Sequence, residues 1–207
     1  MKQAAGPKIQ SIQRNILDFL VRYHPGIDLE DRAEKFVRQF ADYLLPHSKI
    51  LDIGGGWGFY HEPLRCRGHH HVVLDVIKPG VQKCPVVLYD GDQIPFEDES
   101  FDASLLITTL HHMSDPERVI REAVRVTRRT VIVIEDLYHH GPGKVWTKLR
   151  DQFFNVEFFG HAGQFKRKAE WQRIFESQGL HLIEEKEMYT WLSGLRILNG
   201  LLIFQKG

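Results

Sequence analysis

Hydrophobic and polar positions follow two periods along the chain, and each period predicts its own kind of element. Between residues 28 and 46, apolar side chains recur every three or four positions, which indicates one face of an amphipathic helix. A similar stripe lies between residues 12 and 23. Short, mostly apolar runs then follow at 50–53, 71–74 and 86–88, as is typical of strands buried on both faces. Two N-terminal helices followed by parallel strands are therefore predicted.

Strand and helix patterns continue to alternate after residue 100. Apolar runs at 103–107 and 131–134 enclose a helix that begins with Asp115 as its N-cap and Pro116 at its first position. This alternation predicts an α/β fold with a doubly wound parallel sheet and right-handed crossovers. Only about ten residues link Asp75 to the third strand, so a loop is expected there instead of a crossover helix.

The length of 207 residues indicates a single domain. Its expected parts are the N-terminal helices, a core of strands and helices, an irregular aromatic-rich insert, and a closing helix with a β-hairpin whose strands are expected at 180–187 and 198–205. In that order the parts span residues 1–46, 48–136, 137–166 and 167–207.

Charge and cysteine content exclude some classes of function. Lys+Arg and Asp+Glu both number 27, and this zero net charge disfavours a protein that follows a nucleic-acid backbone. Cys66 and Cys84 form no C-x-x-C pattern, so a reduced, cytoplasmic chain is expected. No apolar run approaches the ~20 residues that a membrane-spanning helix requires.

The most informative segment is Leu51-Asp52-Ile53-Gly54-Gly55-Gly56-Trp57-Gly58, in which a glycine loop follows the end of the first predicted strand. Glycines there permit positive φ and close approach of a ligand to the backbone. A dinucleotide fingerprint needs a third glycine at position 59, which is Phe. Asp52 would repel a phosphate and attract an ammonium group. The loop therefore favours a cofactor that joins a nucleoside to a cationic amino acid.

This loop resembles motif I of the class I S-adenosylmethionine (SAM)-dependent methyltransferases. Two further segments resemble the group of that family that acts on small molecules and lipids: residues 94–102, similar to L-P-F-x-x-x-S-F-D, and residues 110–116, similar to L-H-H-x-x-D-P. The resemblance implies a Rossmann-like sheet of seven strands in the order 3-2-1-4-5-7-6, with strand 7 antiparallel. It covers residues 48 to 136.

The resemblance also implies SAM as the cofactor and S-adenosylhomocysteine (SAH) as its product. Asp52 would hold the methionine ammonium directly or through water, Asp75 the ribose hydroxyls, and Asp90 with the Gly91 N–H the adenine edge. The implied cofactor-binding set is Asp52, Gly54, Gly56, Gly58, Asp75, Val76, Asp90, Gly91 and Leu110. Asp75 or Asp90 taken alone is also compatible with an ordinary strand-end carboxylate.

Methyl transfer from a sulfonium mainly requires alignment of the acceptor, but a hydroxyl acceptor also needs a base. The candidate bases are His111, His112, Glu135 and His139. A histidine after the fourth strand can instead serve only to cap the next helix.

The acceptor is expected to be a small, hydrophobic or aromatic molecule that is methylated at oxygen, with carbon and nitrogen as the alternative atoms. The insert 137–166 is expected to wall its pocket. Residues 108–112 lack the [D/N]-P-P-[Y/F] turn of adenine N-methyltransferases. Two alternatives stay open: a methyltransferase-like binding module that acts through a protein partner, and a methyltransferase with a protein or RNA acceptor. The insert is alternatively a lid against the sheet or against a second subunit in a homodimer.

Twelve histidines raise the question of a metal site, especially the run His69-His70-His71. Adjacent strand residues point to opposite faces, so these three side chains cannot converge on one ion. No cysteine or carboxylate lies nearby at metal-ligand spacing. No metal is therefore expected.

Overall fold

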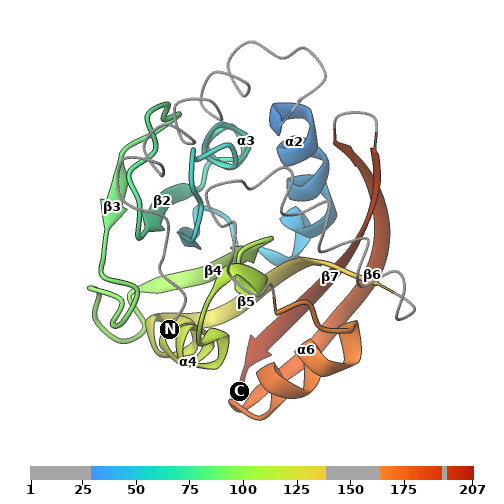
Figure 1. The fold of residues 1–207 in the computed structure, drawn as a ribbon. Coiled ribbons are helices and arrows are strands. Elements are labelled where there is room, and N and C mark those ends of the chain that lie inside the picture. The colour runs from blue at the N-terminus through green and yellow to red at the C-terminus, as the bar shows by residue number, and fades with distance from the viewer. Residues whose placement is uncertain (1–28, 139–163, 193–194) are drawn as a thin grey trace, which may run out of the picture.

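The computed structural model describes residues 29–138, 164–192 and 195–207. A seven-stranded sheet in the order β3-β2-β1-β4-β5-β7-β6 runs through the molecule, with helices on both of its faces (Figure 1). The predicted α/β class and strand order are therefore confirmed.

The first five strands are parallel, and β7 is antiparallel to both of its neighbours, as predicted. The strands are β1 (Lys49–Ile53), β2 (His70–Asp75), β3 (Val86–Leu88), β4 (Phe101–Ile107), β5 (Thr127–Asp136), β6 (Leu180–Leu192) and β7 (Leu195–Lys206). Parallel pairing places the carboxyl ends of β1, β2, β3, β4 and β5 at one edge of the sheet.

The helices fall into two layers. They are α2 (Leu29–Phe40), α3 (His61–Arg65), α4 (Pro116–Val126) and α6 (Lys168–Glu176), with 3₁₀ turns η1 (Ala41–Tyr43) and η2 (Leu110–His112). In Figure 1, α2 and α3 lie above the sheet, and α4 and α6 lie below it. The helix predicted near residues 12–23 and nearly all of the insert 137–166 lie outside the described residues.

The alternation of strand side chains builds a separate hydrophobic core on each face of the sheet. In β1, Leu51 and Ile53 pack with α4 and α6, whereas Ile50 packs with Phe36 and Phe40 of α2. All five side chains are fully buried. Burying one such side chain stabilises the fold by roughly 1.5–3 kcal/mol, so both layers hold the strand ends rigidly in place.

Two expectations about connections are confirmed. No helix separates β2 from β3, because the short link with its prolines leaves no room for a crossover helix. Asp115 caps α4 by accepting a hydrogen bond from the Arg118 backbone N–H at 3.0 Å, and Pro116 begins the helix.

The closing hairpin is longer than its apolar runs predicted. β6 was expected to end near Glu187 but continues to Leu192, and there Tyr189 and Trp191 are 52% and 64% exposed. Near the turn of the hairpin, β6 and β7 pair mainly with each other. The sequence therefore shows no clear alternation of buried and exposed positions there. Within the described ranges, no helix is both long enough and apolar enough to cross a membrane.

Candidate active site

The glycine loop begins where β1 ends, and its first glycine cannot be replaced without strain. The Gly54 N–H donates to the Leu74 carbonyl at 2.7 Å, which ties the loop to β2. Gly54 has φ +73°, and a Cβ added there would lie 2.1 Å from Thr109 Oγ1. The backbone of the loop therefore packs directly against the segment that follows β4.

Gly56 presents bare backbone to open space. Its φ is +52°, and a Cβ added there would meet no atom within 4 Å. The Gly56 N–H donates to Asp75 Oδ2 at 2.9 Å. The loop and the acid at the end of β2, which lie 19 residues apart, thus meet beside a space that a ligand can enter.

Asp75 is held as an acceptor by two backbone groups. Its Oδ1 accepts from the Ile77 N–H at 3.0 Å, while its Oδ2 accepts from Gly56. Burial raises the pKa of the Asp75 carboxyl above its usual value, and these two hydrogen bonds partly oppose that shift. The remaining lone pairs of the two oxygens are suited to a pair of ligand hydroxyls.

The residues predicted to contact adenine lie next to Asp75. A Cβ at Gly91 would lie 3.2 Å from Val76 Cγ1, so residues after β2 and after β3 are in contact. Val76 is 49% exposed. Asp90 is exposed, and its Oδ1 accepts from the Asp92 N–H at 2.9 Å. Burial, followed by the charge of Asp75, raises the pKa of the neighbouring Tyr89 hydroxyl to about 12.

Asp52 lies beneath the loop and is only 1% exposed. A Cβ at Gly55 would lie 2.3 Å from Asp52 Oδ2, and the same oxygen lies 3.3 Å from His71 Nε2. Its predicted contact with an ammonium group stays a prediction. Gly58 closes the loop against Cys84, because a Cβ there would lie 2.7 Å from the Cys84 Sγ.

The end of β4 faces a buried carboxylate at the end of β5. Glu135 Oε1 accepts from the backbone N–H groups of Thr109 and Leu110 at 3.0 and 2.8 Å. Glu135 Oε2 lies 2.5 Å from His111 Nδ1. Leu110 is fully buried. Glu135 is thereby enclosed by N–H groups of η2 and fixes both the turn and the His111 ring.

Aromatic rings surround His111. Its ring centroid lies 4.0 Å from that of His112 and 4.6 Å from that of Phe165, which is stacked on it. The Gln164 N–H donates to the His111 carbonyl at 2.8 Å, so the last residues of the insert contact this turn. Three of the four candidate bases are therefore adjacent, and His139 lies outside the described residues.

A second set of buried polar residues lies at the same edge of the sheet, and it was not predicted from the sequence. The Asn199 amide donates to Asp136 Oδ1 at 2.7 Å and its Oδ1 accepts from the Thr190 hydroxyl at 2.6 Å. Arg32 of α2 donates to that hydroxyl at 3.4 Å. These residues come from four elements, so no local pattern in the sequence could have indicated them.

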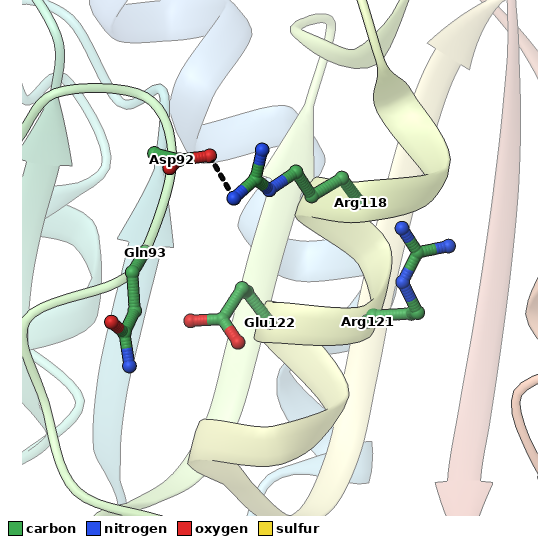
Figure 2. Close-up of a pocket in the computed structure, with 5 residues that line it drawn as sticks. All are labelled: Asp92, Gln93, Arg118, Arg121 and Glu122. Atoms are coloured by element: carbon green, nitrogen blue, oxygen red, sulfur yellow. Dashed lines mark ion pairs between the residues drawn. The ribbon is translucent and has the colours of Figure 1, made fainter.

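Figure 2 shows a polar pocket on the α4 side of the sheet. It is lined by Asp92, Gln93, Arg118, Arg121 and Glu122, with Asp92 and Arg118 forming an ion pair. None of these five residues belongs to the predicted cofactor set. The ion pair holds the 92–93 turn against α4 and so supports Asp90 and Gly91 just before it.

Sequence reasoning also missed a cluster that includes His71. The argument about the adjacent histidines holds in part, because His70 is exposed whereas the His71 side chain is fully buried. However, His61 and Cys84 approach His71 from other segments, and one potential ligand atom of each lies within 4.8 Å of the others. Their separation along the chain hid this cluster.

Comparison with known proteins supports the interpretation of the motifs. Residues 51–134 match the family described as "Methyltransferase domain". The human "Probable tRNA methyltransferase 9B" is 36% identical over 107 residues, which are 49% of this chain and 23% of the relative. A demethylmenaquinone methyltransferase from Renibacterium salmoninarum is 31% identical over 91 residues, 41% of this chain and 38% of the relative. The matches thus cover less than half the length of either relative.

A crystal structure from Thermotoga maritima shows the same fold. It is described as a SAM-dependent methyltransferase, "possible histamine N-methyltransferase", with 21% identity and a TM-score of 0.65. The likeness covers 93% of this chain and 99% of that one. Residues 51–134 are therefore similar to methyltransferase domains, and the chain has the fold of this SAM-dependent methyltransferase.

Proposed function

We propose that this chain is an enzyme that transfers the methyl group of SAM to a small hydrophobic or aromatic acceptor. The observation that carries the proposal is the hydrogen bond from the Gly56 N–H to Asp75, which brings the loop and the ribose-binding acid together beside open space. Gly54 and Gly58 pack the loop against Thr109 and Cys84, which fixes the loop backbone beside the homocysteine portion, while Val76, Asp90 and Gly91 hold the adenine.

The cofactor supplies an activated methyl group on a sulfonium, and the protein orients the acceptor for in-line displacement. With a hydroxyl acceptor, we infer that His111 takes the proton. Glu135 holds Nδ1 of its ring and stabilises the imidazolium that forms. Because three N–H groups already surround the Glu135 carboxylate, Glu135 acts as a positioning residue in this proposal. His112 is the second candidate base, since its ring lies beside that of His111.

A glutamine variant separates the base from the structural contact. His111→Gln keeps an N–H that can reach Glu135 but removes the titratable ring. We expect kcat to fall by about 10²–10⁴-fold, with SAH affinity within about twofold of the parent protein. His112→Gln is the matched comparison. Full turnover by His111→Gln would contradict the role of His111 as the base and leave His112 as the candidate.

Oxygen is the proposed methyl-accepting atom, and the polar network of Asp136, Asn199 and Thr190 at the same sheet edge is available to bind a polar group of the acceptor. The names of the relatives point to two acceptor classes, a tRNA and a quinone precursor. The zero net charge favours the small molecule, whereas 36% identity to the tRNA enzyme supports RNA as the second candidate.

The test is transfer of a radiolabelled methyl group from SAM to two panels, phenols and quinols on one side and bulk tRNA on the other. Label in the phenols or quinols would support the proposal. Label in tRNA alone would show that the acceptor is an RNA and not a small molecule. Calorimetry with SAH tests the binding module: tight SAH binding without transfer to either panel, even with cell extract as the acceptor, would favour a domain that acts through a partner. Failure to bind SAM or SAH would refute the enzyme and the version of the binding module that holds the cofactor.

A further inference from the structure

Three potential metal ligands converge behind the glycine loop, outside the groups used in the proposed reaction. His61 is the first residue of α3, His71 lies in β2, and Cys84 lies two residues before the start of β3. One ligand atom of each lies within 4.8 Å of the other two. His61 Nδ1 and His71 Nδ1 are 3.4 Å apart.

That distance fits two ligands of one tetrahedral ion. With Zn–N bonds of about 2.0–2.1 Å at the tetrahedral angle, two histidine nitrogens lie about 3.3–3.4 Å apart. A hydrogen bond between two neutral imidazoles also fits 3.4 Å. The additional cysteine sulfur distinguishes the two interpretations, since a hydrogen-bonded pair has no use for a third donor.

The other nitrogen of His71 is arranged as metal-bound histidines usually are. His71 Nε2 lies 3.3 Å from Asp52 Oδ2, and the two side chains are 0% and 1% exposed. Neither of these two buried atoms has a hydrogen-bond partner in the described structure. A metal on Nδ1 places the ring proton on Nε2, facing the carboxylate, and such carboxylate–histidine–metal arrangements orient the ring and raise its basicity.

We propose that His61, His71 and Cys84 bind a zinc ion, with Asp52 behind His71. Two imidazoles and one thiolate are a donor set that suits zinc, whereas magnesium and calcium prefer oxygen ligands. Three protein ligands leave the fourth position to a water or another donor.

The buried carboxylate of Asp52 places a negative charge directly behind the cluster, and a bound cation would offset that charge. Zinc binds the thiolate form of cysteine, so binding would release the Cys84 thiol proton into solvent.

The site lies where it would stabilise the loop. The Lys83 N–H donates to the Trp57 carbonyl at 2.9 Å, and Cys84 packs against Gly58. An ion held by Cys84 and the two histidines would therefore connect the loop, the start of α3, β2 and the segment just before β3. This role is structural and does not depend on the proposed methyl transfer.

The first experiment uses the full chain without an affinity tag. We expect about one zinc per chain by elemental analysis after incubation with zinc and gel filtration. Cys84→Ser and His61→Ala should each lower zinc affinity at least tenfold in competition with a chromophoric chelator. The matched controls are Cys66→Ser and His70→Ala, because both parent residues are exposed.

Cobalt provides a second readout that needs no variant. Co²⁺ bound to the parent protein should show tetrahedral d–d bands and a thiolate-to-cobalt charge-transfer band. In Cys84→Ser, the charge-transfer band should be lost or weakened more than the d–d bands. Circular dichroism checks that each variant is folded. Zinc binding that survives both site variants, loss of zinc in the control variants, or absence of the charge-transfer band in the parent protein would overturn the proposal. SAH affinity, measured separately, reports on the methyltransferase function alone.

Discussion

At the residue scale, two glycines of one loop have different physical reasons to lack a side chain. Gly54 combines φ +73° with a neighbour 2.1 Å from the position of a Cβ, whereas Gly56 combines φ +52° with empty surroundings. The first glycine therefore serves packing, and the second leaves open the surface at which we propose that the cofactor binds.

Alanine substitutions separate these roles. Gly54→Ala should lower the free energy of unfolding by about 2–4 kcal/mol, because a steric clash adds to the cost of positive φ. Gly56→Ala should cost only about 1–2 kcal/mol but weaken SAH binding at least tenfold. Urea titration and calorimetry measure the two effects. Equal destabilisation by both substitutions, or parental SAH affinity in Gly56→Ala, would contradict this division.

We expect Asp75 to make cofactor affinity depend on pH. In the proposed site the carboxylate form accepts the ribose hydroxyls, and burial raises the Asp75 pKa. The loss of SAH affinity on acidification should therefore begin above the pH range of an ordinary aspartate. Asp75→Asn should bind SAH about 10–100-fold more weakly at pH 7, which corresponds to the loss of charge-assisted hydrogen bonds. It should also lack this acid dependence. Calorimetry across pH checks both, and an unchanged pH profile in the variant would assign the titration to another group.

At the element scale, α2 is joined to the segment after α3 by Glu34. Its carboxylate accepts from both Nη atoms of Arg67, at 3.0 and 2.7 Å, and from Arg38 Nε at 2.7 Å. These hydrogen bonds, those of Arg67 first, lower the Glu34 pKa from 4.5 to about 2. Because the folded pKa is the lower one, the stabilisation is complete above about pH 4.5 and disappears as the pH falls toward 2.

Glu34→Gln should therefore reduce stability at pH 7 by about 0.5–1.5 kcal/mol, a modest value because the side chains are about 30% exposed. The difference between variant and parent should shrink as the pH falls toward 2. Urea unfolding at neutral and acid pH measures it. Glu97→Gln, at an exposed position, is the control, and a difference that does not vary with pH would show that the Glu34 charge is not responsible.

The elements themselves were largely predictable because burial on both faces leaves a strong pattern. Ile50 to Ile53 and the run 131–134 indicated central strands, and Asp115-Pro116 marked a helix start. The outer hairpin near Trp191 was underestimated, since its side chains are exposed. The His61–His71–Cys84 cluster and the Asn199 network could not be predicted, because only the folded sheet brings their residues together.

At the scale of the whole molecule, the edge formed by the carboxyl ends of the parallel strands collects the predicted cofactor residues from four separate segments. The sequence could indicate this convergence, since parallel strands end at one edge. It could not indicate that Asp52 lies beneath the loop, because that depends on packing between Gly55 and His71.

Ligand binding across these segments should stabilise the whole domain. At a SAH concentration 100 times its dissociation constant, the gain is about 2.7 kcal/mol, which corresponds to a rise in melting temperature of roughly 5–10 °C for a chain of this size. NAD⁺ is the control, because Phe59 replaces the third glycine of a dinucleotide loop. Thermal denaturation followed by fluorescence measures both, and stabilisation by NAD⁺ instead of SAH would contradict the cofactor assignment.

The missing crossover helix between β2 and β3 has a kinetic consequence. Val76 is half-exposed at the end of β2, and only a loop follows it before the three-residue strand β3. If the adenine binds beside Val76 as proposed, it can leave toward solvent without displacement of a helix. Departure of the spent nucleoside should accordingly be rapid, so that turnover is set by events on the acceptor's side.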